Sequence, residues 1–177
     1  MAFGRNPRKL MSEAELYEYA VGALGRRMRS VAELKRLLRR RVEPGELGEA
    51  LVELVIVRLK DQKYLNDAQY AAAYSSFRKE NEKFGKLRVI SDLKSRGVHQ
   101  DVISKAMEST YGDTDEEQLA RAYLQRKRVR KPESDREAAK IFRSLMRAGF
   151  SKRSIIRVLN HWGVEDEVLG ALEEENG

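Results

Sequence analysis

The sequence predicts an all-α protein made of three tandem three-helix repeats that form an elongated, curved array. Three observations lead to this prediction: the chain repeats itself, helix-start and helix-stop signals recur regularly, and turn formers are scarce, with 12 glycines and 3 prolines in 177 residues. Residues 93–98 align with residues 145–150 at an offset of 52, and the apolar positions on either side align as well. A period of roughly fifty residues is typical of a small supersecondary unit that buries its core only against neighbouring copies.

Capping-box spacing marks four helix starts. In a capping box, a serine or threonine oxygen accepts a hydrogen bond from the amide three residues on, and the glutamate there bonds back to the amide of the cap. This spacing occurs at Ser12, Ser30, Thr114 and Ser134. Simple N-caps are expected at Asn66 and Ser151.

Glycines are expected to close three helices, because a left-handed residue commonly ends a helix and glycine adopts that conformation without strain. These are Gly97, Gly149 and Gly163. With the apolar periodicity, the signals predict helices over residues 12–28, 30–41, 46–62, 66–83, 86–96, 99–110, 114–130, 134–148, 151–162 and 164–175. The predicted domains are a basic N-terminal arm at 1–11, repeats at 12–63, 64–112 and 113–163, and an acidic C-terminal helix or tail at 164–177.

Composition favours a binding protein of the cytoplasm. Charged residues make up 36% of the chain and apolar residues 41%, a balance that suits a thin helical array with much surface. No run approaches eighteen apolar residues, the start has no apolar signal core, and there are 0 cysteines, so we expect a cytoplasmic protein without disulfides or thiolate metal sites. Repeat arrays with sealed ends are often monomers, and we expect a monomer here.

The net charge of +7 is unevenly distributed. Residues 1–41 carry +7 and residues 121–163 carry +10, whereas the acidic residues 164–177 carry −6. Two basic blocks of this kind favour a polyanion or an acidic protein face as partner. The acidic end is expected to be a solvated helix, with an autoinhibitory tail as the alternative.

Candidate partner-binding or nucleic-acid-binding residues lie in both basic blocks. In the second block they lack local acidic neighbours: Arg126, Lys127, Arg128, Arg130, Lys131, Arg143, Arg147, Lys152, Arg153 and Arg157. In the first block they are Arg26, Arg27, Arg29, Lys35, Arg36, Arg39 and Arg40. The alternative for either block is a set of solvated cations that complement helix dipoles. Arg143 and Arg147 are expected on the helix face opposite Ile141 and Leu145.

Other residue types offer little chemistry. The helical spacing of Tyr70, Tyr74 and Phe77 predicts core residues rather than base-stacking platforms, and the same is expected of Tyr64 and Phe84. The two histidines, His99 and His161, have no metal-binding spacing. There is no phosphate loop and no ordered catalytic triad, so neither an enzyme nor a cofactor is expected.

Several segments resemble a known family. Residues 63–67, Lys-Tyr-Leu-Asn-Asp, resemble a Gly-Tyr-Leu-Asp/Asn-Asp segment of the RecX regulatory proteins. Residues 29–34, 84–98 and 148–155 resemble that family's first-repeat, central and closing segments, in the same order. Lys63 stands where the family has glycine, so a looser turn is expected there.

The resemblance implies a negative regulator of the RecA recombinase. Members of the family dock in the groove of the RecA–DNA filament and suppress its ATPase, strand-exchange and co-protease activities. On this basis the expected partner is the RecA filament. The alternative is a basic helical-repeat module that binds single- or double-stranded DNA directly, and no membrane partner is expected.

Overall fold

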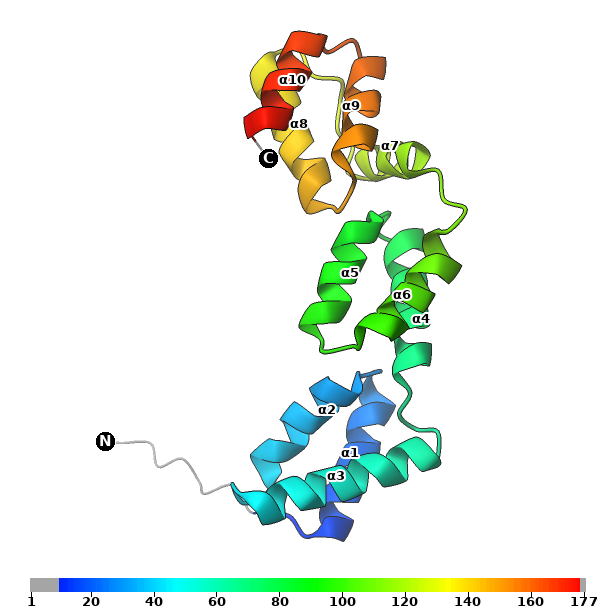
Figure 1. The fold of residues 1–177 in the computed structure, drawn as a ribbon, viewed down its shortest axis with the longest axis vertical. Coiled ribbons are helices and arrows are strands. Elements are labelled where there is room, and N and C mark those ends of the chain that lie inside the picture. Colours follow the sequence, from blue (N-terminus) through cyan, green and yellow to red (C-terminus); the bar gives the residue numbers. More distant parts are fainter. Residues whose placement is uncertain (1–9, 176–177) are drawn as a thin grey trace, which may run out of the picture. The chain divides into compact units, whose positions relative to one another are not determined.

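The protein is helical throughout the part that the structure describes, residues 10–175 of a computed structural model (Figure 1). Within that range there are ten α-helices, one short 3-10 helix and no strand. The elements are α1 (Glu13–Arg26), α2 (Val31–Leu38), η1 (Arg39–Arg41), α3 (Glu46–Asp61), α4 (Asp67–Glu80), α5 (Lys86–Ser95), α6 (Gln100–Tyr111), α7 (Glu116–Arg126), α8 (Asp135–Arg147), α9 (Lys152–His161) and α10 (Asp166–Glu175). The predicted all-α fold is therefore confirmed. Of the predicted N-terminal arm, residues 1–9 lie outside the described range, and so do residues 176–177 of the C-terminal segment.

The capping signals were correct at most helix starts. Ser12 and Ser30 form complete capping boxes, with both the serine oxygen and the glutamate engaged. Ser134 accepts from the amide of Glu137, but that glutamate bonds to the amide of Glu133 instead of the cap, so the box is incomplete. The start marked by Thr114 was wrong: the cap of α7 is the next residue, whose carboxylate accepts from Gln118. Asn66 and Ser151 cap α4 and α9 as predicted.

Six of the described helices are followed by a residue with a positive φ. Gly97, Gly149 and Gly163 have the positive φ that was predicted for them, +74°, +89° and +76°. Three further closures use residues with side chains, Lys63, Lys83 and Arg128, at φ values of 62°, 59° and 55°. The turn at Lys63 is not loose, because the amide of Tyr64 still donates to the carbonyl of Leu59 over 2.9 Å.

The closure at Arg128 explains the largest error in the predicted boundaries. The sequence predicted a helix over 114–130, whereas α7 runs only from Glu116 to Arg126. The amide of Val129 turns back to the carbonyl of Leu124 over 2.9 Å, which ends the helix although the neighbouring cations favour helix. Residues 127–134 therefore form a non-helical connection to α8.

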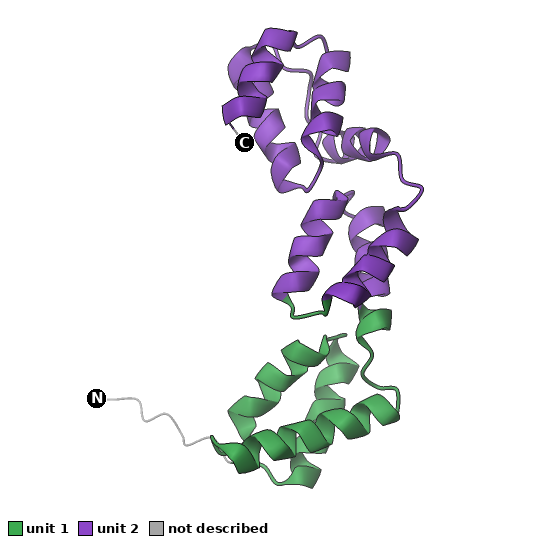
Figure 2. Ribbon diagram, viewed as in Figure 1, with its two compact units in different colours: residues 1–70, 96–99 green, residues 71–95, 100–177 purple. Residues whose placement is uncertain are grey.

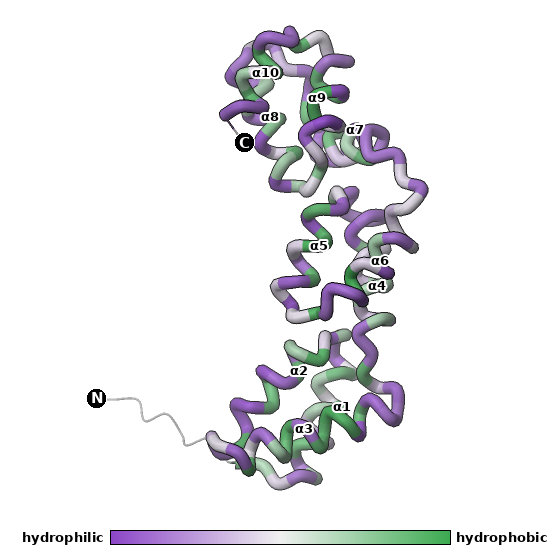
Figure 3. Tube along the Cα trace, in the orientation of Figure 1, coloured by the Kyte–Doolittle hydropathy of each residue, from purple (hydrophilic) through white to green (hydrophobic). Residues whose placement is uncertain are grey.

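The described residues divide into two compact units, coloured separately in Figure 2. Unit 1 holds the chain up to Tyr70 together with Arg96–His99, and unit 2 holds Ala71–Ser95 and the chain from Gln100 onward. In unit 1 the core consists of apolar side chains from α1, α2 and α3 together with Val42 and Leu65. In unit 2 the larger core joins α7, α8, α9 and α10, and Leu169 and Leu172 anchor the acidic last helix in it. The alternation of apolar and polar residues along the helices in Figure 3 is typical of helices that bury one face.

The start of one helix contacts the turn after a later helix once in each unit. In unit 1 the start of α2 touches the turn after α5: the hydroxyl of Ser30 donates to the carbonyl of Arg96 over 2.6 Å. In unit 2 the start of α5 touches the turn after α8: the amides of Gly85 and Leu87 donate to the carbonyls of Ala148 and Gly149. The two turns lie at the repeat offset of 52 residues, so the repetition in the sequence extends to these contacts.

Of the described helices, none combines the length and the apolar character needed to span a lipid bilayer.

Candidate functional site

The first basic block separates into two flanks of α2. On one flank, Lys35 forms an ion pair with Glu53 of α3, and Arg39 forms a bidentate pair with Glu49 at 2.7–3.0 Å. The hydrogen bond between Arg39 and Glu49 raises the pKa of the Arg39 guanidinium and holds the pKa of the Glu49 carboxyl below its ordinary value. These two predicted site residues are therefore occupied by contacts within unit 1.

The other flank carries arginines without such partners. Arg36 lies on α2, Arg40 lies four residues later in η1, and Arg27 and Arg29 lie in the connection from α1. Together with Glu33 and Leu37 they line a hollow of about 340 Å³, named here the arginine hollow. Arg26, also predicted, is exposed in the last turn of α1 and does not line it.

In unit 2 the predicted residues Arg143 and Arg147 are exposed, and Ile141 and Leu145 are buried, as the helical period indicated. The exposed face of α8 is longer than predicted, because Arg136 and Lys140 precede them at spacings of four and three residues. We name these four residues the α8 stripe. Within residues 10–175 no carboxylate forms an ion pair with any of the four. Extending the period backward from Arg143 would have found the two missing cations in the sequence.

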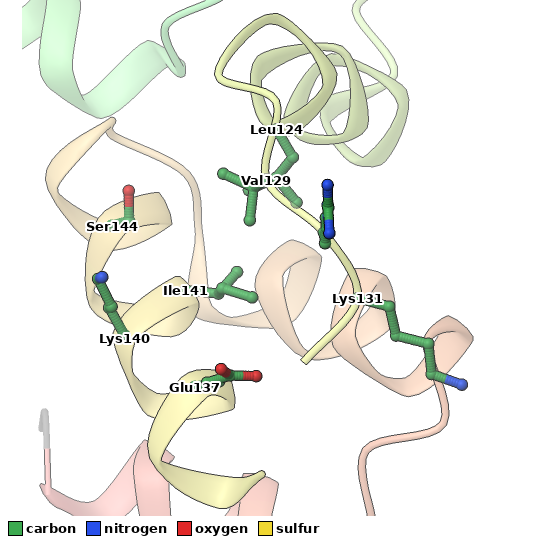
Figure 4. Close-up of a pocket in the computed structure, with 8 residues that line it drawn as sticks. Leu124, Val129, Lys131, Glu137, Lys140, Ile141 and Ser144 are labelled. Atoms are coloured by element: carbon green, nitrogen blue, oxygen red, sulfur yellow. The ribbon is translucent and has the colours of Figure 1, made fainter. Parts of the chain in front are cut away.

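A second hollow lies between the connection after α7 and the helix α8 (Figure 4). It measures about 320 Å³, and Figure 4 shows Leu124, Val129 and Ile141 pointing toward one another across it. The side chain of Lys131 extends away from this apolar floor. Named here the α7–α8 hollow, it is lined by Leu124, Val129, Arg130, Lys131, Glu137, Lys140, Ile141 and Ser144. An apolar floor beside cations suits an apolar partner side chain with a carboxylate next to it.

The remaining predicted cations line neither hollow, and all of them except the half-buried Lys152 are exposed. Arg126, Lys127 and Arg128 lie at the end of α7, where the ammonium of Lys127 is 5.9 Å from the ring of Tyr123. On α9, Arg153 and Arg157 face outward one turn apart. Lys152 donates instead to the backbone carbonyl of Glu173 in α10, over 3.2 Å. Its ammonium is thus partly used to hold the last helix.

The aromatic residues are divided between core and surface. Tyr70 is buried, and half-buried Phe84 lies 6.1 Å from the ring of Tyr123. The half-buried Tyr74 donates to Asp92 over 2.9 Å. The prediction of a core position was wrong for Tyr64 and Phe77, which are 59% and 54% exposed.

The described residues contain no group of three or more histidine, cysteine, aspartate or glutamate side chains that could hold a metal ion. Two half-buried acids accept hydrogen bonds that join helix ends. Asp67 accepts from the amide of Val31 over 2.8 Å, and burial raises the pKa of this carboxyl. Burial acts the same way on Glu116, but bonds from Ser151 and Ser154 outweigh it and hold the pKa of that carboxyl below its ordinary value.

Comparison with known proteins identifies the family. A family model described as "RecX, second three-helix domain" matches residues 66–107. The chain is 31% identical over 147 residues to the "Regulatory protein RecX" of Pseudomonas fluorescens, covering 83% of this chain and 91% of that protein. It is 30% identical over 153 residues to the "Regulatory protein RecX" of Geobacillus kaustophilus, covering 85% of this chain and 55% of that longer relative.

Two solved structures share the fold. One, described as "Crystal structure of regulatory protein RecX", superposes with a TM-score of 0.70 at 21% identity and covers 84% of this chain and 73% of that one. The other, RecX from Lactobacillus salivarius, superposes with a TM-score of 0.64 at 21% identity and covers 85% of this chain and 96% of that one. Similarity over almost the whole length of the Pseudomonas protein therefore shows that this chain belongs to the RecX family of regulatory proteins.

Proposed function

We propose that this protein is a negative regulator of the RecA recombinase. In this proposal it docks in the groove of the RecA–DNA filament and inhibits the ATPase, strand-exchange and co-protease activities of the filament. Membership of a family of regulatory proteins supports regulation as the broad role. The proposed mode of action is binding without catalysis.

The observation that carries the docking proposal is the α8 stripe. Four exposed cations on one face of a helix, without ion-pair partners among residues 10–175, create a strongly positive ridge. The α7–α8 hollow adds an apolar floor directly beside this ridge, since Lys140 belongs to both. A positive ridge beside an apolar socket favours a protein partner with acidic residues around an apolar side chain.

The test is RecA-catalysed ATP hydrolysis on single-stranded DNA at moderate salt, with the protein added in stoichiometric amounts. The wild-type protein is expected to lower the rate. Arg143→Glu combined with Arg147→Glu is expected to abolish this inhibition while the helical circular dichroism stays unchanged, because both side chains are exposed. An unchanged rate with the wild-type protein would refute the proposal.

A matched control reverses two charges elsewhere in unit 2. Lys94→Glu with Lys105→Glu changes exposed cations of α5 and α6 that line neither hollow. This variant is expected to inhibit like the wild type. Equal loss in both double variants would show that inhibition depends on net charge and not on the α8 stripe.

A further inference from the structure

The arginine hollow is distinguished from the rest of the first basic block by what its cations lack. It is lined by Arg27, Arg29, Arg36 and Arg40, with a single acid, Glu33. Among residues 10–175 no carboxylate forms an ion pair with any of these four arginines. Lys35 of α2 and Arg39 of η1 form ion pairs with glutamates of α3, so cations of this segment are paired on one flank and unpaired on the other.

Glu33 does not neutralise the hollow. One oxygen of its carboxylate accepts from the amide of Ser30 over 3.1 Å, and the other accepts from the guanidinium of Arg96 over 2.7 Å. Its negative charge is therefore shared with a fifth arginine. The hollow keeps a large positive surplus that the folded unit 1 itself does not balance.

A second, independent observation points to a missing acceptor. The Nε of Arg29 is buried and has no hydrogen-bond partner among the described residues. Buried donors in folded proteins are nearly always satisfied, because water is lost without replacement when they are not. Arg29 is also one of the residues that line the hollow, so the guanidinium with this unpaired donor belongs to the proposed site.

The chemistry of the lining selects the kind of anion. All four cations are guanidinium groups, whose planar forks match phosphate oxygens and keep their charge at every physiological pH. At the start of α2 the amide of Val31 is already bonded to Asp67 and the amide of Glu33 to Ser30. The guanidinium side chains are therefore the main donors for the ligand. Four guanidinium groups exceed what one carboxylate needs and suit successive phosphates of a strand.

We propose that the arginine hollow binds backbone phosphates of a nucleic acid strand. This site goes beyond regulation of the recombinase and does not require it, since the hollow lies wholly in unit 1 and the α8 stripe lies in unit 2. Contact with phosphates carries no base information, so binding is expected to be independent of DNA sequence.

The experiment measures fluorescence anisotropy of a labelled single-stranded oligonucleotide titrated with the full-length protein, without RecA, over a series of salt concentrations. The test variant is Arg36→Gln with Arg40→Gln, chosen because both side chains are exposed and their loss does not endanger folding. We expect at least about a tenfold weaker affinity. In a plot of the logarithm of the binding constant against the logarithm of the salt concentration, each lost phosphate contact should make the slope less steep by roughly 0.7.

The control is Lys35→Gln with Arg39→Gln, which removes the same charge from the same segment, α2 and η1, but from the flank paired with α3. We expect it to change the affinity less than about threefold. Equal weakening by both variants, or none by either, would overturn the proposal. It would also be overturned if the Arg36/Arg40 variant bound DNA normally but lost inhibition of RecA, because the hollow would then contact an acidic protein surface. Loss of DNA binding with normal inhibition of RecA would support the site and leave the proposed function intact.

Discussion

The amide of Gly85 donates a 2.8 Å hydrogen bond to the carbonyl of Ala148, which joins the start of α5 to the turn between α8 and α9 in unit 2. The approach is so close that a Cβ atom added to Gly85 would lie 2.3 Å from the carbonyl oxygen of Gly149. Both segments are among those that resemble the RecX family in sequence. Each of the two segments thus provides one side of the same contact.

Replacing Gly149 with alanine is expected to destabilise unit 2 by more than about 2 kcal/mol, because the left-handed conformation is strained for any other residue. The residue has a φ of +89°, and an added Cβ would lie 2.1 Å from the amide nitrogen of Arg88. Urea denaturation followed by circular dichroism measures the change. As a control, Gly170→Ala in α10 has open space around the new methyl group and is expected to stabilise the helix by up to about 1 kcal/mol. Equal changes in the free energy of unfolding for Gly149→Ala and Gly170→Ala would contradict the close contact between Gly149 and Arg88.

Replacing Lys63 with glycine is expected to stabilise unit 1 by about 1 kcal/mol, since it relieves the strain of a left-handed lysine. The φ of Lys63 is 62°, and the closing bond from Tyr64 to Leu59 does not involve its side chain. The midpoint of thermal unfolding is the measurement. Ala50→Gly, at an exposed position inside α3, should instead cost about 1 kcal/mol. A loss of stability in both variants would contradict the expected relief of backbone strain by glycine at position 63.

Ser30→Ala is expected to cost more than Ser12→Ala, although both serines form capping boxes. Loss of an N-cap costs about 1 kcal/mol, and this should be the whole effect at the exposed Ser12. At the buried Ser30 the hydroxyl also donates to the carbonyl of Arg96, so its removal leaves that acceptor without its partner and adds about 1–3 kcal/mol. Parallel chemical denaturation of the two variants tests this difference. Identical losses would show that the bond to Arg96 contributes nothing.

Glu116→Gln tests a stability that depends on pH. The carboxylate of Glu116 accepts from the amide and hydroxyl of Ser151 and from the hydroxyl of Ser154, and its pKa in the folded chain lies below the ordinary 4.5. A lowered folded pKa means that the contribution of this group is present above about pH 4.5 and is lost as pH falls through the folded value. The wild type should therefore exceed the variant in stability at neutral pH, and the difference should shrink in acid.

Denaturation midpoints of wild type and Glu116→Gln across this pH range provide the measurement. Glu108→Gln, at an exposed position on α6, serves as the control and should show no such convergence. A difference between wild type and Glu116→Gln that stays constant with pH would indicate a steric effect of the amide and contradict the role of the charge.

Most of the helices could be predicted because their signals are local. The helix starts are predicted by capping residues whose bonds reach no further than four residues along the chain, at Ser12, Ser30 and Ser151. The helix ends are predicted in the same local way by glycines that adopt a positive φ, at Gly97, Gly149 and Gly163. The end of α7 was missed because Arg128 adopts a left-handed conformation that its residue type disfavours. Such a choice depends on the packing of Leu124 and Val129 against the core.

The sequence by itself determined the helical class, the repeat and the presence of two basic blocks, because periodicity, capping and composition act over short distances along the chain. Only the tertiary structure decided which cations are left for a partner. Lys35 and Arg36 are neighbours in the sequence, yet one pairs with Glu53 of α3 and the other lines the arginine hollow. The physical reason is that an ion pair forms between side chains that the fold brings within a few ångströms of each other, and separation along the chain does not specify that distance.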